Sequence, residues 1–271
     1  MPRPTRRSKY RFLAGRFYYT VRRYLQWHLG RSDWADMRGD SLEYTVFEHR
    51  TPLIRPLPNH AMWMQRNKIK NLEIATRALD GVILGPGQTL SFWRRIGRPT
   101  RRRGYVEGMV LQDGDVVPGI GGGLCQLSNL IYWMTLHTPL TVVERHRHSY
   151  DAFPDSDRTQ PFGSGATCAY PYVDLQICNN TTESYQIRVH LIEASLVGQW
   201  RAEREPLHTY RVYEKDHWIT HETWGGYVRH NVIHREVFNK EGTRVDDEYV
   251  TENHAIMMYQ PLLDCARDPR Q

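Results

Sequence analysis

The stretch that organises this chain is Gly119-Ile-Gly-Gly-Gly-Leu-Cys-Gln-Leu-Ser128. Glycine permits a left-handed backbone and the close approach of another group, and the apolar run at residues 127–136 has helical spacing. We therefore predict a glycine turn that opens a helix, with Cys125 in its first turn. The N-terminal end of a helix stabilises an anion and favours a thiolate. Two interpretations stay open: a reactive cysteine beside an anion-binding loop, or a tight turn before a buried structural cysteine.

The composition and the pattern of β-forming segments indicate the fold class. The chain has 271 residues, of which 40% are hydrophobic and 24% charged, as in a globular protein with a sizeable core. Helical spacing recurs at residues 60–79. Two strands are expected around the turn Gly85-Pro-Gly87, the second reaching Trp93, and another strand at residues 170–178. From Tyr185 onward, short β-forming segments alternate with turn signals. These patterns predict an α+β fold: a mixed, mostly antiparallel sheet with a few helices and an all-β C-terminal third.

Three regions of the chain differ in character. Residues 1–36 form a basic amphipathic N-terminal segment, and residues 37–182 form a domain that contains the glycine-rich loop and Cys125. Residues 183–271 are β-rich and could pack with the preceding domain as one unit.

The positive charge of the chain lies at its N-terminus. Residues 1–31 contain nine arginines or lysines and no acidic residue, although the net charge of the whole chain is only +6. Aromatic and aliphatic residues at helical spacing interrupt these arginines, which predicts peripheral contact with an anionic membrane through residues 3–29. The alternative is a helix docked on its own domain with solvated arginines. We expect no nucleic-acid partner, no signal peptide and no transmembrane helix, hence a cytoplasmic protein, peripheral on the membrane if the helix binds lipid.

The cysteines give no sign of a metal or cofactor site. Cys125, Cys168, Cys178 and Cys265 lack the spacing of zinc ligands, and no lysine with serine or threonine follows the glycines as in a phosphate-binding loop. A metal site from Cys125, His146 and His148 is conceivable but has no recognised ligand spacing. We therefore expect no metal and no cofactor, with reduced thiols as in cytosolic proteins.

Three segments are candidates to converge on one site. They are the glycine-rich loop with Cys125, Glu144-Arg-His-Arg-His-Ser149, and Gly163-Ser-Gly-Ala-Thr-Cys168 followed by Asp174. A nucleophilic cysteine needs a base, which His148 or His146 would supply, and an orienting group, which Asp174 or Glu144 would supply. Such a group would catalyse acyl transfer through a thioester. The alternative is that the histidines lie on the surface and that Glu144 and Arg145 form a structural ion pair.

Several of these motifs together resemble the VanW domain family. In order, they are Gly85-Pro-Gly-Gln-Thr-Leu-Ser-Phe92, Gly121-Gly-Gly-Leu-Cys-Gln126, Leu130-Ile-Tyr132, Glu144-Arg-His-Arg-His-Ser149, Asp174-Leu175 and Asn179-Asn-Thr181. The resemblance covers about residues 65 to 182. It implies a role in vancomycin resistance and in cell-wall peptidoglycan, with a peptidoglycan precursor or peptide stem as the partner. VanW domains on some larger secreted proteins resemble a cysteine L,D-transpeptidase.

The resemblance also assigns roles to residues of this chain. Cys125 would be the nucleophile and His148 its base, with Glu144 and Arg145 completing the catalytic group. The substrate-binding residues would be Gly121, Gly122, Gly123, Gln126, Ser149 and Thr167. Many family members have Asp-Ala-Thr where this chain has Gly165-Ala-Thr167, so one carboxylate is absent. A non-catalytic accessory or binding protein for cell-wall precursors at the cytoplasmic face of the membrane is therefore the alternative.

Overall fold

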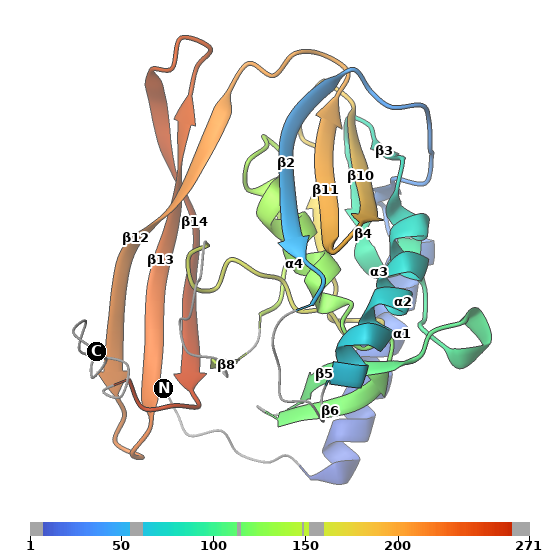
Figure 1. Ribbon diagram of the computed structural model, residues 1–271, viewed down its shortest axis with the longest axis vertical. Coiled ribbons are helices and arrows are strands. Elements are labelled where there is room, and N and C mark those ends of the chain that lie inside the picture. The colour runs from blue at the N-terminus through green and yellow to red at the C-terminus, as the bar shows by residue number, and fades with distance from the viewer. Residues whose placement is uncertain (1–7, 55–61, 113–114, 148, 152–159, 262–271) are drawn as a thin grey trace.

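The computed structural model describes residues 8–54, 62–112, 115–147, 149–151 and 160–261. Over these residues the fold is α+β, with four α-helices and mostly antiparallel strands, as predicted (Figure 1). The helices are α1 (Lys9–Leu29), α2 (Met62–Leu79), α3 (Phe92–Ile96) and α4 (Cys125–Thr135).

The strands form four sheets. One contains β2 (Tyr44–Pro52), β11 (Ser195–Ala202), β10 (Tyr185–Ile192) and β3 (Val82–Leu84), and a second contains β1 (Asp33–Trp34), β4 (Gln88–Ser91), β9 (Gln176–Cys178) and β7 (Thr141–Glu144). A third contains β12 (Thr209–His221), β13 (Tyr227–Phe238), β14 (Arg244–Met257) and β8 (Tyr150–Asp151), and the fourth is the hairpin β5 (Glu107–Gln112) with β6 (Asp115–Ile120). Two of the pairings, β1 with β4 and β14 with β8, are parallel, and the others are antiparallel.

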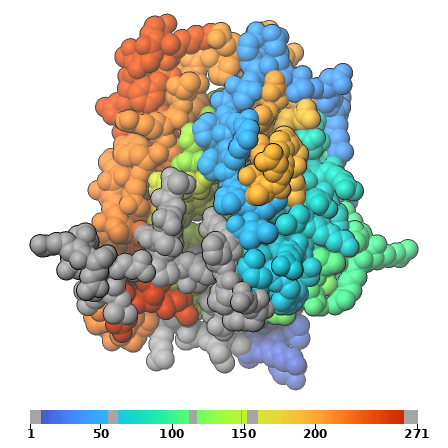
Figure 2. Space-filling model, viewed as in Figure 1, coloured from blue at the N-terminus to red at the C-terminus, as the bar shows by residue number. Residues whose placement is uncertain are grey.

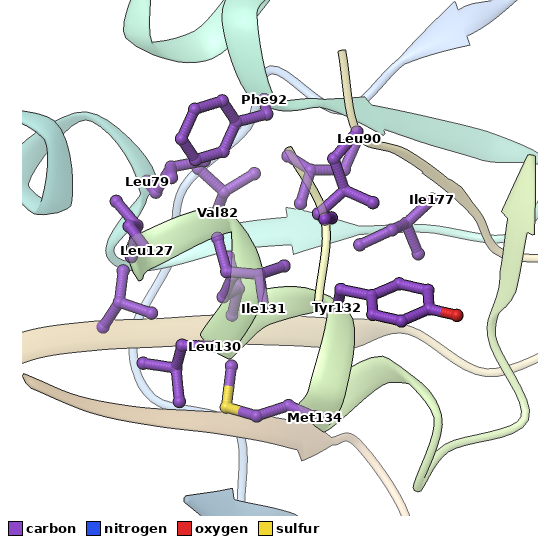
Figure 3. Packing of buried hydrophobic residues seen from close by; sticks show 14 of the residues in the cluster. Leu79, Val82, Leu90, Phe92, Leu127, Leu130, Ile131, Tyr132, Met134 and Ile177 are labelled. Atoms are coloured by element: carbon purple, nitrogen blue, oxygen red, sulfur yellow. The ribbon is translucent and has the colours of Figure 1, made fainter. Parts of the chain in front are cut away.

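Helix α4 lies at the centre of the hydrophobic core. Its side chains Leu127, Leu130 and Ile131 are at most 1% exposed, and Figure 3 shows them among apolar side chains of α2, β3, β4 and β9. On the other side, α4 packs against β2 and β11, where Trp200 is fully buried and its Nε1 donates to Thr135 Oγ1 at 3.1 Å. The run that follows the glycine-rich loop is therefore a buried helix, as its composition predicts.

Helix α1 contacts the rest of the protein along one side only. It begins at Ser8, whose Oγ accepts from Arg11 N, and among its residues only Arg23 and Trp27 are buried. Its N-terminal end extends beyond β5 and β6 in Figure 1. No helix in the described ranges is long and apolar enough to cross a membrane.

Two predicted strands are shorter than expected. Phe92 and Trp93 begin α3 instead of continuing β4, because Ser91 caps the helix and the buried Asp174 carboxylate accepts from Trp93 N at 2.9 Å. In the segment predicted as a strand at residues 170–178, only Gln176–Cys178 is a strand.

The expected region boundaries at residues 36 and 182 stay predictions. Beyond residue 182, β10 and β11 pair with β3 and β2 in one sheet. The three long strands β12, β13 and β14 stand beside this sheet on the other side of α4 (Figure 1).

Candidate functional site

The glycine-rich loop is packed closely against its own chain. Gly121 and Gly123 have φ angles of 76° and 92°, which only glycine adopts without strain. A side chain on Gly122 would place its Cβ 2.1 Å from the main-chain carbon of Gly108 in β5, and Asn71 Nδ2 donates to Gly122 O at 2.9 Å. These glycines therefore serve the contact between the loop and β5, and their predicted role in substrate binding stays a prediction.

Cys125 is the first residue of α4, as the sequence predicts. Its Sγ lies 3.6 Å from the carbonyl oxygen of Cys168 and 3.7 Å from the Sγ of Cys168. Cys125 is half-buried, whereas Cys168 is buried. Burial, and then the neighbouring Cys125, raise the pKa of the Cys168 thiol well above its usual value. Cys168 thus remains a protonated thiol that can donate to the Cys125 sulfur.

Glu144 lies at the end of β7 and accepts hydrogen bonds from three directions. His146 Nε2 donates to Glu144 Oε1 at 3.0 Å, Arg23 Nη2 of α1 forms a short ion pair with the same oxygen, and Asp174 N lies 3.4 Å away. Burial opposes ionisation, but the bonds from His146 and Arg23 outweigh it and hold the pKa of Glu144 below its usual value. Glu144 is thus ionised at neutral pH and orients His146.

Of the two candidate bases, His146 lies within the described residues and His148 does not. The His146 imidazole contacts Glu144, and its main-chain oxygen accepts from Thr167 N at 2.8 Å. No hydrogen bond between His146 and Cys125 occurs in the described part of the chain. His148, which the resemblance assigns as the base, lies outside the described residues.

Asp174 is buried and fixes the start of α3. It accepts from Ser91 Oγ at 2.6 Å, from Trp93 N and from Leu175 N. Burial raises its pKa to about 6, although these donors act in the opposite direction. Of the two carboxylates considered as orienting groups, Glu144 is therefore the one that contacts a histidine, and Asp174 supports the segment behind it.

Arg145 holds main-chain carbonyls and makes no ion pair with Glu144. Its Nε donates to Gly165 O at 2.9 Å, its Nη2 donates to Gly163 O, and its guanidinium lies 4.6 Å from the ring centre of Tyr132. The ion pair between Glu144 and Arg145 that the sequence suggested is thus wrong, and Arg23 takes that place. The geometry gives Arg145 a role in shaping the 163–165 turn, while its assignment as a catalytic residue stays a prediction.

The remaining predicted substrate-binding residues contact the chain itself. Gln126 Nε2 donates to Thr51 Oγ1 at 3.0 Å and to Pro52 O at 2.9 Å, which ties the start of α4 to β2. Thr167, the residue before Cys168, pairs with His146 in a β-bridge. The segments that contain His146 and Cys168 therefore lie side by side. Ser149 is exposed, and its carbonyl accepts from Ile256 N of β14.

The space beside Gly165, where the resemblance led us to expect a carboxylate, is filled by the amide of Asn129. A Cβ on Gly165 would lie 2.6 Å from Asn129 Oδ1. That oxygen accepts a hydrogen bond from Ala166 N at 2.8 Å, and Ser128 Oγ donates to Ala166 O at 2.6 Å. Helix α4 therefore fixes the 165–166 backbone directly through Ser128 and Asn129.

Sequence reasoning missed Arg23 as a contributor to the site. Arg23 was one of many arginines in the basic N-terminal segment, and the position of Trp27 one helical turn later was the signal that this face is buried. The segment that ends at Cys168 was expected to converge with Cys125, but no local pattern indicates the contact between the two thiols. In the ranges described above, no three His, Cys, Asp or Glu side chains are grouped as metal ligands.

Comparisons with known proteins agree with this arrangement of motifs. The family model described as "VanW like protein" matches residues 67–201. The chain is 32% identical over 219 residues to the vancomycin B-type resistance protein VanW of Enterococcus faecalis, covering 81% of this chain and 80% of that protein. It is 25% identical over 135 residues to the uncharacterized protein YoaR of Bacillus subtilis, covering 49% and 42%. No solved structure matches. The chain belongs to the VanW family.

Proposed function

We propose that this protein is a cysteine acyltransferase, similar to an L,D-transpeptidase, that acts on peptide stems of peptidoglycan or its precursors in glycopeptide resistance. The observation that carries the proposal is the position of Cys125. Its half-buried thiol begins α4 and lies 3.7 Å from the Sγ of Cys168. The likeness to a vancomycin resistance protein supports the choice of substrate class.

The proposed reaction has two balanced steps. In the first, a base takes the Cys125 proton, Sγ bonds to the carbonyl carbon of a stem peptide bond, and the amine leaves with that proton. In the second, an acceptor amine attacks the thioester and gives its proton to the base, while Sγ leaves as a thiolate. His148 is the base in this proposal, and the start of α4 favours the negative charge on sulfur and on the oxyanion.

The main-chain N–H groups near Cys125 support the oxyanion part of this proposal. Within the described residues, the N–H groups of Gly123 and Leu124 donate to no other residue, and no side chain caps the start of α4. These donors adjoin the nucleophile in sequence, as an oxyanion-binding pair requires.

The direct test is to look for the covalent intermediate. The protein is incubated with tetrapeptide and pentapeptide muropeptides, and intact-mass spectrometry measures the mass gained on the protein. We expect an acyl adduct that peptide mapping places on Cys125, and none in Cys125→Ala. Cys178→Ala is the matched control, because Cys178 is also half-buried but donates to Asn180 instead. An adduct that survives in Cys125→Ala would exclude Cys125 as the nucleophile.

Selective alkylation gives a test that needs no substrate. An electrophilic probe should label Cys125 before Cys168, Cys178 or Cys265, because the start of a helix favours the reactive thiolate. Equal labelling of all four cysteines, or none in the folded protein, would remove the case for an activated nucleophile.

The contact with Cys168 predicts a particular pH profile. If the Cys168 S–H donates to the Cys125 thiolate, Cys168→Ala should raise the pH of half-maximal Cys125 alkylation by about one unit. Cys168→Ser, which keeps a donor, should largely retain the original profile. An unchanged midpoint in Cys168→Ala would show that Cys168 contributes packing alone.

A second candidate is a non-catalytic accessory protein that binds cell-wall precursors at the cytoplasmic face of the membrane. The observation that favours it is Gly165, where a carboxylate of many family members is absent and Asn129 occupies the space. This candidate predicts that Cys125→Ser leaves glycopeptide resistance intact in a host that depends on this protein. The acyltransferase proposal predicts that the same variant loses resistance.

A further inference from the structure

The outward face of α1 carries a continuous apolar stripe that the rest of the described chain leaves exposed. Tyr10 is 84% exposed and Phe17 72%, and further apolar side chains follow along the same helix face. The stripe consists of Tyr10, Leu13, Phe17, Val21 and Leu25, which recur at intervals of three and four residues. Isolated apolar side chains on a surface are ordinary, but a row of this length indicates a binding face.

Positive charge borders the stripe on both edges. At 100° per residue, Arg11 and Arg22 fall beside one edge and Lys9 and Arg16 beside the other. All four are exposed, and α1 contains no aspartate or glutamate. The stripe and its basic edges are therefore suited to a partner with an apolar interior and a negatively charged surface, rather than to a neutral or basic partner.

The opposite face of α1 holds the helix on the protein. Arg23 donates to Gln26, Glu144 and the carbonyl of Tyr172, and Trp27 Nε1 donates to Ser91 Oγ at 3.2 Å. The buried face is thus at the C-terminal half, while the N-terminal end extends past β5 and β6 (Figure 1). Figure 2 shows this end uncovered at the lower edge of the molecule on the side in view. The stripe is consequently not needed to complete the core.

We propose that α1 lies flat on an anionic phospholipid bilayer, with the apolar stripe at the boundary between headgroups and acyl chains. Tyrosine and phenylalanine are favoured at this depth, and arginines on the flanks reach the lipid phosphates. A helix exposed along a convex stripe fits a planar bilayer better than a grooved protein partner. This inference is independent of the acyl transfer chemistry.

The geometry also relates the bilayer to the candidate site. The helix that contacts lipid carries Arg23, which is paired with Glu144, and Tyr24, whose hydroxyl lies 2.7 Å from that of Tyr170. Binding through α1 thus fixes one orientation of the Glu144 and Cys125 region relative to the membrane. A substrate linked to lipid would meet the site in that orientation.

The test is co-sedimentation of the full chain with phospholipid vesicles. We expect binding to vesicles of phosphatidylcholine with roughly 30% phosphatidylglycerol, and binding at least about tenfold weaker to phosphatidylcholine alone. The variant Tyr10→Gln/Leu13→Gln/Phe17→Gln should lose at least about tenfold in affinity, because glutamine keeps helix propensity but removes the apolar surface. Circular dichroism checks that its helix content is unchanged.

Matched variants distinguish binding through the α1 stripe from non-specific binding of exposed apolar side chains to vesicles. Val143→Gln/Leu207→Gln/Tyr249→Gln removes three exposed apolar side chains elsewhere and should bind vesicles like the parent chain. Arg11→Gln/Arg22→Gln should weaken binding to the anionic vesicles about tenfold, whereas Arg50→Gln/Arg204→Gln should not. Equal binding of the parent and the α1 variants would overturn the proposal. So would a parent dimer, seen by light scattering, that the α1 variants dissociate without any vesicle binding.

Discussion

The part of the protein around α4 and the sheet β12–β14 are held together by different interactions. Every buried member of the main hydrophobic cluster lies between Trp27 and Ala202, and from β12–β14 only the partly buried Val212 and Val250 pack against it. The sheet is joined to the rest by polar contacts: Arg235 donates to the carbonyls of Leu136 and Thr138, and Asn231 donates to the carbonyl of Phe162.

This difference has a clear physical meaning. Burial of apolar surface is non-directional and cooperative, so we expect the α4 region to fold and unfold as a unit. Hydrogen bonds to main-chain carbonyls are individually modest and directional, so they orient the sheet more than they stabilise the whole chain. The region that matches the VanW family model, residues 67–201, contains most of the apolar core.

The largest effect is expected from a cavity in the α4 region. Leu130 is 1% exposed, and Leu130→Ala should lower the free energy of unfolding by about 2–5 kcal/mol, since the removed side chain leaves a cavity that packing does not fill. Denaturant unfolding measures this loss. In β12, Ile219 is 41% exposed, and Ile219→Ala should change stability by less than about 0.5 kcal/mol. A loss of similar size in Ile219→Ala would contradict the exposed position of this side chain.

A second effect concerns the buried carboxyl group of Asp174. Its pKa is raised to about 6 by burial, so the folded protein holds a proton that the unfolded chain releases near pH 4. Stability contributed by this proton is fully present below about pH 4 and is lost as the pH rises through 6, by up to about 3 kcal/mol. In Asp174→Asn, the free energy of unfolding should not fall over this pH range. Urea unfolding at several pH values measures the difference.

Asp247, in the sheet β12–β14, should show the opposite dependence of stability on pH. Hydrogen bonds from His234 and Tyr213 lower the pKa of Asp247 in β14, so its contribution is present at neutral pH and is lost on acidification. Asp247→Asn should therefore change the pH dependence in the opposite direction to Asp174→Asn. A common direction for both variants would contradict the assigned environments.

The smallest effect should come from the polar attachment of the sheet. Arg235→Ala removes the donors to Leu136 O and Thr138 O and should cost about 1–2 kcal/mol. The expected signature is faster hydrogen exchange in β12–β14 with little change in α4. Lys240→Ala, which removes the exposed pair with Glu205 beside the sheet, is the control and should have almost no effect. Faster exchange in α4 would show that the two regions unfold together.

Local chemistry made much of the fold predictable. The glycines before Cys125 and the apolar run after it predicted α4 correctly, and the alternation beyond Tyr185 predicted the C-terminal strands. The prediction that the strand continues through Trp93 was wrong. The conformation there depends on Asp174, 81 residues away, whose carboxylate accepts from Trp93 N. Residue patterns within a short window contain no information about such a partner.

The site was predicted less completely for the same reason. The motifs singled out Cys125 and Glu144, and the structure links their segments through the pairing of His146 with Thr167 and the contact of Cys168 with Cys125. Their roles as site residues stay predictions. The alternative of an ion pair between Glu144 and its sequence neighbour Arg145 was wrong, because the partner is Arg23, 121 residues away on α1. Long-range ion pairs and the contact of two thiols arise from how the elements pack, so one sequence does not specify them.

The contact between Asn129 and Gly165 constrains how this protein could change over evolution. A side chain at position 165 would displace the Asn129 amide and disturb its hydrogen bond with Ala166 N. A carboxylate at position 165 of this chain therefore needs the Asn129 side chain to move or to be replaced by a smaller one. Either substitution alone disturbs the 165–166 backbone, two residues before the Cys168 thiol that contacts Cys125, so the two positions are coupled.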